Sequence, residues 1–217
     1  MTASLVSPDF TAQTTPPQHP LRLGIMASGS GSNFEALAQA IAAGTLPAQI
    51  QVLIYNNPEA KVVQRAQRLQ VPAVLHNHRD YPSREDLDAM IVETLKAYHV
   101  DWVVMAGWMR IVTPVLIDAF PQHILNIHPS LLPSFKGIRA IEQALAAGVK
   151  ITGCSVHLVT EAMDSGPILI QAAVPILPGD TPETLHARVQ VQEHHILPAA
   201  ILLAQQPATV VPVSGTV

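Results

Sequence analysis

Short apolar runs alternate with segments of helical periodicity along most of this chain. The apolar runs cover residues 21–27, 49–55, 72–76 and 101–106, and between them apolar residues recur every three or four positions, as in amphipathic helices. The connections are too long for hairpins, so successive strands must be parallel and joined by crossover helices. The pattern predicts an α/β fold built on a doubly wound, mostly parallel sheet.

The last third of the chain departs from this alternation. Two strand-like runs, 151–160 and 168–176, are joined by a short loop, which predicts a late antiparallel strand pair at one end of the sheet. A long helix is expected from Thr181 to about Leu203, with Pro198 kinking or interrupting it. An edge strand is expected at 209–213.

Composition narrows the class of protein. Hydrophobic residues make up 48% of the 217 residues and charged residues only 13%, which suits a sheet buried on both faces. The net charge of −4 without a basic stripe argues against nucleic acid as a partner, and no apolar run is long enough to span a membrane. The single cysteine cannot form an internal disulfide. We expect a cytoplasmic protein that acts on small molecules, as a monomer or homodimer.

The expected domain covers residues 21–205, with a C-terminal strand or tail at 206–217. Residues 1–20 contain no Lys or Arg and are rich in Thr, Gln and Pro. They therefore lack the features of a secretory signal or a transit peptide. We expect them to form a disordered N-terminal extension.

The stretch from His123 to Pro133 carries the clearest chemical pattern. Residues two apart on a strand face the same side, so Asn126 and His128 project together near the carboxyl end of a strand, where an open α/β sheet binds its ligand. An amide can donate to a developing oxyanion, and an imidazole can deliver a proton near neutral pH. The pair suits attack on a carbonyl followed by expulsion of a basic leaving group. The alternative is ordinary turn chemistry before a Pro-containing loop.

A glycine-rich turn, Ser28-Gly29-Ser30-Gly31-Ser32-Asn33, separates the first strand from the first helix. Glycines let the backbone approach a ligand, and a helix start offers N–H groups to an anion. A dinucleotide-binding fingerprint would need a glycine at Phe34 and an acid where Asn56 and Asn57 stand. A monophosphate fits this turn better. The alternative is a plain Gly-Ser turn that caps a helix.

Asp164 lies in a loop flanked by Gly and Pro between the two late strands. It is either a solvated loop carboxylate or, if the loop folds over His128, an ion-pair partner that keeps this imidazole charged as a general acid. On the preceding strand, Cys154 is expected to face the core. Ser155 and His157 share the opposite face, where they either border the site or have a structural role.

Four motifs, taken together and in this order, resemble those of the folate-dependent phosphoribosylglycinamide formyltransferases. The motifs are Ser-Gly-Ser-Gly-Ser-Asn at 28–33, Ala-Gly-Trp-Met-Arg-Ile at 106–111, Asn-Ile-His-Pro-Ser-Leu-Leu-Pro at 126–133 and Gly-Cys-Ser-Val-His-Leu-Val-Thr-Glu-Ala-Met-Asp-Ser-Gly-Pro at 153–167. The resemblance extends from about Leu21 to Pro198 and includes Gln192-Glu193-His194. It implies a Rossmann-like formyltransferase fold and transfer of a formyl group from 10-formyltetrahydrofolate to the amine of 5-phosphoribosylglycinamide, in de novo purine biosynthesis and without a metal.

The same resemblance implies a role for each matching residue. Asn126, His128 and Asp164 would be catalytic. The substrate phosphate would be bound by Gly31, Ser32 and Asn33, and the glycinamide and ribose end by Glu193. The residues that would border the folate are Arg84, Met109, Arg110, Ile111, Val112 and Asn126.

Other functions remain open at this point. A formyltetrahydrofolate hydrolase would transfer the group to water, and a methionyl-tRNA formyltransferase to a charged tRNA. The hydrolase normally has a regulatory domain ahead of the core and the tRNA enzyme an extra C-terminal domain, and we expect neither in this sequence. A non-catalytic phosphate-binding module would keep the Gly-Ser turn but would not need Asn126, His128 and Asp164 together.

Overall fold

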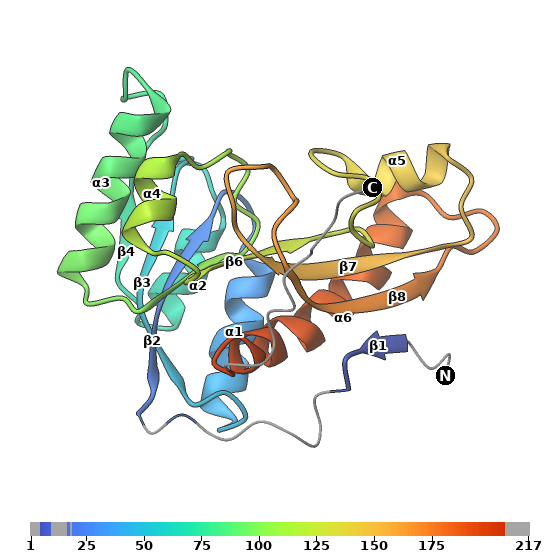
Figure 1. Cartoon of the computed structure of the whole chain (residues 1–217), viewed down its shortest axis with the longest axis horizontal. Coiled ribbons are helices and arrows are strands. Elements are labelled where there is room, and N and C mark those ends of the chain that lie inside the picture. The colour runs from blue at the N-terminus through green and yellow to red at the C-terminus, as the bar shows by residue number, and fades with distance from the viewer. Residues whose placement is uncertain (1–4, 10–16, 18, 207–217) are drawn as a thin grey trace. The chain divides into compact units, whose positions relative to one another are not determined.

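The computed structural model describes residues 5–9, 17 and 19–206 (Figure 1). The chain divides into two compact units, one of residues 16–126 and the other of residues 1–15 together with 127–217. The boundary falls inside strand β6 (Ile124–His128). Each unit has its own secondary structure and is described separately.

The unit of residues 16–126 is built on a parallel sheet. Its strands are hydrogen-bonded in the order β6-β5-β2-β3-β4, and all four pairs are parallel. The strands besides β6 are β2 (Leu21–Ala27), β3 (Ala48–Tyr55), β4 (Ala73–Leu75) and β5 (Trp102–Met105). Because β2 and β5 are buried almost throughout, both of their faces are covered. The predicted mostly parallel α/β fold is confirmed.

Four helices connect these strands, as the alternation predicted. They are α1 (Ser32–Ala42), α2 (Val62–Arg68), α3 (Arg84–Ala97) and α4 (Pro114–Ala119). Helices α3 and α4 lie side by side in Figure 1. Helix α3 packs so closely on β2 that a Cβ added to Gly24 would overlap the Leu95 side chain. The Ser83 hydroxyl caps α3 by accepting the Asp86 N–H at 3.0 Å.

The unit of residues 127–217 contains the predicted antiparallel pair. Strands β7 (Ile151–Leu158) and β8 (Ile168–Pro175) are antiparallel, with a register shift between Val156 and His157. Helices α5 (Ala140–Ala146) and α6 (Pro182–Leu203) complete the unit. Helix α6 runs through Pro198 without interruption.

The N-terminal residues differ in part from the expectation. Residues 5–7 form strand β1 (Leu5–Ser7), which pairs antiparallel with β8 in the register Val6 to Ala172. The prediction of disorder is therefore wrong for these three residues. The physical reason is that the outer edge of β8 offers unpaired backbone groups, and an apolar extended segment can pair with them. Residues 1–4, 10–16 and 18, and the edge strand expected at 209–213, lie outside the described residues.

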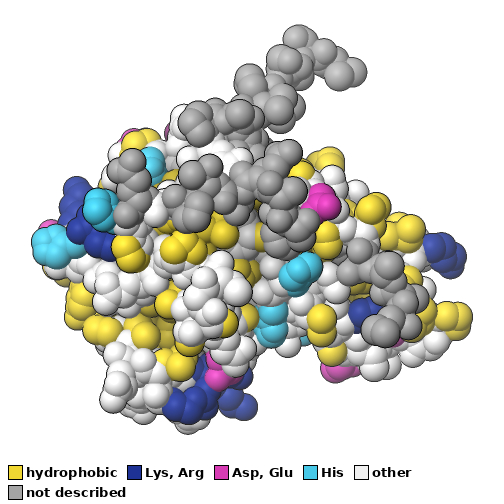
Figure 2. All heavy atoms as spheres, turned by 90° about the horizontal axis from the view of Figure 1, so that it is seen from below, with side chains coloured by type: hydrophobic (Ala, Val, Ile, Leu, Met, Phe, Trp, Pro, Cys, Tyr) yellow, Lys and Arg dark blue, Asp and Glu magenta, His cyan; other side chains and the backbone are white. Residues whose placement is uncertain are grey.

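The surface carries few charges, as the composition implies. On the face drawn in Figure 2, Lys and Arg side chains occur in a few small separate groups rather than as a stripe. Among the described residues, no helix combines the length and the apolar character needed to cross a bilayer.

Candidate active site

Strand β6 presents the two residues that the sequence singled out. Its parallel pairing with β5 sets Asn126 opposite Met105. Asn126 and His128 share a face because they are two residues apart on this strand. Asn126 is half-buried, whereas His128 is 6% exposed. Pro129 follows directly and cannot extend the ladder as a donor, so the strand ends at the imidazole.

Both ring nitrogens of His128 face oxygen atoms. Nε2 lies 2.8 Å from the Phe135 carbonyl oxygen, and Nδ1 lies 3.6 Å from Oδ2 of Asp164. A neutral imidazole has a single N–H, so only the imidazolium can offer a proton to both oxygens. His128 is thus placed between the Phe135 carbonyl and the Asp164 carboxylate.

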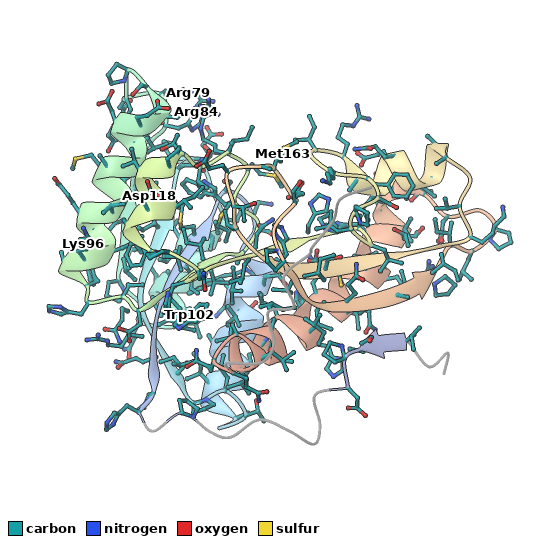
Figure 3. All side chains as sticks on the ribbon, in the orientation of Figure 1. Arg79, Arg84, Lys96, Trp102, Asp118 and Met163 are labelled. Carbon is teal, nitrogen blue, oxygen red and sulfur yellow. The ribbon has the colours of Figure 1, made fainter. Side chains whose placement is uncertain are left out.

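The loop between β7 and β8 holds Asp164 against His128. The Asp164 side chain is only 9% exposed, and Oδ2 accepts the Gly137 N–H at 2.8 Å. Burial alone would raise the pKa of Asp164, but hydrogen bonds from His157 and Gly137 and the nearby imidazoles outweigh it and leave the pKa below its ordinary value. Asp164 thus stays ionised at neutral pH beside His128. Met163, which is labelled in Figure 3, belongs to this loop.

Asp164 has a second histidine neighbour that the sequence reasoning did not assign to the site. Its Oδ1 lies 3.6 Å from Nε2 of His157, which is 2% exposed on β7. The strand pattern placed His157 on the right face but left its role open. The contact depends on how the loop returns over the strand, which local periodicity does not encode.

The glycine-rich turn has a packing explanation as well as a functional one. Gly31 has φ +75°, and a Cβ at this position would overlap Val62 of α2. The turn is also held by hydrogen bonds from the Val62 N–H to the Gly29 carbonyl (3.1 Å) and from Arg65 Nε to the Ser30 carbonyl (2.8 Å). No side chain caps α1. A Cβ placed on Gly29 would meet no atom within 4 Å, so the backbone there is open to a ligand.

The segment from Met109 to Val112 is irregular and directly attached to this turn. The Met109 N–H donates to the Ser28 hydroxyl at 2.9 Å, and the Ser28 N–H donates to the Gly107 carbonyl at 3.0 Å. Met109 and Ile111 are 74% and 50% exposed, whereas Val112 is buried. Nε of Arg110 is buried without a hydrogen-bond partner among the described residues. The segment thus offers apolar surface and a cation side by side.

Arg84 is the first residue of α3 and is exposed. In Figure 3 it lies at one end of this helix, opposite Lys96 at the other. One turn further into α3, the buried Asp88 accepts the Thr113 N–H at 2.6 Å. Burial raises the pKa of Asp88, and the hydrogen bond from Thr113 offsets only part of this. Asp88, which the sequence reasoning missed, anchors the chain directly after Val112.

Glu193 of α6 is 5% exposed, so it is a buried carboxyl and not a solvated helix residue. Burial first, and the nearby charge of Glu193 second, raise the pKa of the Cys154 thiol far above its ordinary value. Cys154 is therefore a core residue, as expected, and unsuited to act as a thiolate nucleophile.

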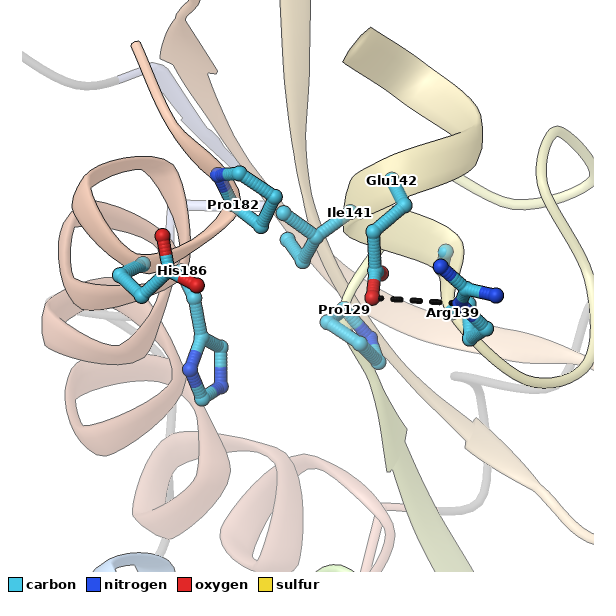
Figure 4. Close-up of a pocket in the computed structure, with 8 residues that line it drawn as sticks. Pro129, Arg139, Ile141, Glu142, Pro182 and His186 are labelled. Carbon is cyan, nitrogen blue, oxygen red and sulfur yellow. Dashed lines mark hydrogen bonds and ion pairs between the residues drawn. The ribbon is translucent and has the colours of Figure 1, made fainter. Parts of the chain in front are cut away.

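A pocket of about 310 Å³ opens beside Pro129, the residue that follows His128 (Figure 4). Its remaining lining comes from the starts of α5 and α6, and Arg139 pairs with Glu142 on the α5 wall at 3.4 Å. Cations and carboxylates are mixed on its wall, and none of the predicted site residues lines it. The predicted site is therefore not this pocket.

The fold and these side chains define a class: α/β proteins with a mostly parallel sheet, whose candidate site pairs an imidazole at a strand end with a buried loop carboxylate. Within this class, the chain matches the Formyl transferase family over residues 21–201. The chain belongs to this family.

Several relatives and solved structures are similar over most of the chain. The phosphoribosylglycinamide formyltransferase of Mycobacterium tuberculosis (strain H37Rv) is 43% identical over 197 residues, which cover 90% of this chain and 91% of that protein. The corresponding protein of Bacillus subtilis is 39% identical over 180 residues, 83% of this chain and 92% of that one. The crystal structure of glycinamide ribonucleotide transformylase 1 from Symbiobacterium toebii superposes with a TM-score of 0.83 at 47% identity, covering 85% and 87% of the two chains.

Other relatives are much longer. The trifunctional purine biosynthetic protein adenosine-3 of Homo sapiens is 43% identical over 182 residues, which are 84% of this chain but 18% of that protein. The chain therefore spans only 14% to 20% of the length of the trifunctional relatives that it matches.

Proposed function

We propose that this chain transfers the formyl group of 10-formyltetrahydrofolate to the amine of 5-phosphoribosylglycinamide, giving formylglycinamide ribonucleotide and tetrahydrofolate in de novo purine biosynthesis. Membership of the formyl transferase family supports this, as do the names of relatives that match over nine-tenths of their length. The observation that carries the proposal is the buried Asp164 carboxylate 3.6 Å from His128, on a strand that also presents Asn126.

These three residues have the chemistry that formyl transfer needs. When the substrate amine attacks the formyl carbon, negative charge develops on the carbonyl oxygen, and the Asn126 amide and a protonated His128 would stabilise it. The folate nitrogen must then gain a proton to leave. His128 would supply that proton directly, or a water ordered by Asp164 would relay it. The Phe135 carbonyl occupies Nε2 of His128 in this structure, so direct transfer requires Nε2 to exchange this partner for the substrate.

The remaining predicted residues would bind the two substrates. Gly31, Ser32 and Asn33 would hold the phosphate, since α1 begins there without a side-chain cap and a helix start attracts anions. Glu193 would bind the glycinamide and ribose end.

The folate would lie along Arg84 and the segment Met109, Arg110, Ile111 and Val112, with Asn126 at its reactive end. The exposed Met109 and Ile111 fit an apolar ring, and the buried Nε of Arg110, which has no hydrogen-bond partner in the described part of the chain, fits an anion. The chemistry supplied by this co-substrate is the activated formyl group. No metal is part of the proposed mechanism.

A direct assay separates this function from its rivals. The purified protein is incubated with 10-formyltetrahydrofolate, with and without 5-phosphoribosylglycinamide, and release of tetrahydrofolate is followed. Turnover that requires the nucleotide supports the proposal. Equal turnover without it would identify a formyltetrahydrofolate hydrolase, and no turnover with phosphate-ligand binding intact would identify a non-catalytic module.

Replacement of Asn126 by Ala tests the oxyanion role. Losing one oxyanion donor typically costs on the order of a hundredfold in kcat. Steady-state kinetics on the variant, with its fold checked by circular dichroism, measures this. Near-normal turnover would remove Asn126 from the mechanism.

The partners that fit this function are small molecules, acted on in the cytoplasm. Nucleic acid and membrane are not required by the proposed reaction, and both a monomer and a homodimer are compatible with it. Sedimentation of the purified chain distinguishes these two states.

A further inference from the structure

The Asp164 carboxylate faces two imidazoles, those of His128 and His157. Oδ2 of Asp164 lies 3.6 Å from Nδ1 of His128, and Oδ1 lies 3.6 Å from Nε2 of His157. All three side chains are at least nine-tenths buried. The proposed reaction accounts for His128 and Asp164 but gives His157 no part.

The second nitrogen of each ring also faces an oxygen. Nε2 of His128 is 2.8 Å from the Phe135 carbonyl, and Nδ1 of His157 is 2.9 Å from the Leu158 carbonyl. Each ring can therefore donate to both of its neighbours only as an imidazolium. Asp164 thus lies between the two imidazoles, with one carboxylate oxygen facing each ring.

The backbone around His157 is shaped to make this contact. The β7–β8 register shifts between Val156 and His157, and such bulges re-aim a side chain. Gly166 packs so tightly on the Leu158 carbonyl that a Cβ would overlap it. Asp164 itself has φ +48°, a conformation uncommon for a residue other than glycine. The end of β7 and the β7–β8 loop are thus held in place around the Asp164 carboxylate.

We propose that His157 is a positioning residue of the formyl-transfer site, which holds the Asp164 carboxylate against His128. The proposal rests on the function proposed above. Among the charged and polar groups of the described residues that face Asp164 are His128 from β6, His157 from β7 and the Gly137 N–H from the loop before α5. The neighbouring Lys136 is bonded to the Ser165 hydroxyl at 2.5 Å.

The test compares two replacements of His157 with a matched control. His157→Leu removes the donor, and His157→Gln keeps an N–H donor near the position of Nε2 without a titrating ring. The control is Thr152→Val on the same strand, because Thr152 is 1% exposed and its hydroxyl has no hydrogen-bond partner among the described residues. All three variants change a buried polar residue of β7.

A positioning role predicts a specific kinetic pattern. In His157→Leu, kcat falls about tenfold or more, as for a lost hydrogen bond to a charged group, while KM for both substrates changes little. The acid limb of the kcat profile moves to higher pH, because the hydrogen bond that lowers the pKa of Asp164 is gone. His157→Gln recovers most of kcat, and Thr152→Val matches the wild type. Equal losses of kcat in His157→Leu and His157→Gln, with an unshifted pH profile of kcat, would overturn the proposal.

A second measurement does not depend on turnover. The Asp164 carboxyl is titrated by ¹³C NMR in the wild type, His157→Leu and His157→Gln. The midpoint is expected at higher pH in the Leu variant and near the wild-type midpoint in the Gln variant; if the Leu variant does not fold, His157→Asn, whose shorter amide cannot reach Asp164, takes its place. Coinciding midpoints in all folded variants would overturn the positioning role. A wild type without formyl transfer would instead refute the proposed function, and the titration would still report on His157.

Discussion

The glycine-rich turn at 28–33 and the cluster of His128, His157 and Asp164 are the two chemically suggestive regions of this molecule, and they differ in what explains them. The turn is accounted for by packing, because Gly31 has φ +75° and lies against Val62. The cluster buries two imidazoles and a carboxylate next to one another. Nothing in the packing of the sheet requires ionisable groups there.

The difference separates evidence for a fold from evidence for a function. Any chain that packs α2 this closely on the first turn would need glycine at position 31, with or without a ligand. Buried polar groups cost free energy unless they are paired, and a non-glycine residue at positive φ adds about 1 kcal/mol or more. The cluster offsets the cost of burial by pairing its groups but keeps Asp164 at positive φ, and such local exceptions are typical of functional sites.

The largest effect is expected from Asp164→Asn. The change keeps the size of the side chain and an acceptor for the Gly137 N–H, but removes the charge that faces His128. If His128 is the general acid, kcat should fall on the order of a hundredfold. Steady-state kinetics at saturating substrates measures the effect.

The pH dependence of stability provides a control for Asp164→Asn. The pKa of Asp164 is lowered from 3.8, so its contribution to stability is present above that value and is lost as the pH falls through the lower native pKa. The variant should therefore be less stable than the wild type at neutral pH, with a difference that shrinks in acid. A variant with normal kcat would show that the cluster is structural, like the turn.

For the glycine-rich turn, the first effect expected of a substitution is on stability and not on kcat. Gly31→Ala forces a left-handed conformation and an overlap with Val62, which together should cost roughly 2 to 4 kcal/mol of unfolding free energy. Gly29→Ala is the matched control, since nothing lies within 4 Å of its Cβ position and its φ is not positive. Urea unfolding of both variants measures the costs.

The same pair of variants tests the phosphate role. If the turn binds the substrate phosphate through closely approaching backbone, Gly29→Ala should raise KM for 5-phosphoribosylglycinamide while leaving stability nearly unchanged. An unchanged KM in Gly29→Ala would leave packing as the whole explanation of this turn.

The sequence predicts the elements well where local periodicity decides them. Helix α6 spans Pro182–Leu203, against an expected range of Thr181 to about Leu203, and the parallel and antiparallel parts of the sheet are confirmed. The pairing of Asn126 with His128 on one face follows from the two-residue period of a strand. Each of these features depends on residues close together in the chain.

What the sequence does not reveal depends on distant contacts. Strand β1 forms because β8 offers an edge, although the first residues look like a disordered tail. The His157–Asp164 contact depends on a bulge and on a loop that returns over β7. Asp88 reaches Thr113 across 25 positions. No periodic pattern encodes such contacts.

The smallest effect is expected for an ion pair outside both regions. Asp180 binds Arg188 through two hydrogen bonds, of 2.7 and 2.9 Å, and accepts the Leu177 N–H at 2.7 Å. Hydrogen bonds from Arg188 first, and from Leu177 second, hold the pKa of Asp180 well below its ordinary value of 3.8. Its stabilisation is therefore present at neutral pH and lost only as the pH falls below that value.

Asp180→Asn should lower Tm slightly at neutral pH, and the difference from the wild type should shrink at about pH 3. Calorimetry at the two pH values measures this, and kcat should be unchanged because Asp180 contacts none of the proposed site residues in the described structure. Asp164→Asn and Asp180→Asn each remove one carboxylate with a lowered pKa, so their comparison isolates position from charge. A comparable loss of kcat in both variants would mean that the cluster has no catalytic role of its own. Ion pairs in this unit would then affect turnover only through the stability of the unit.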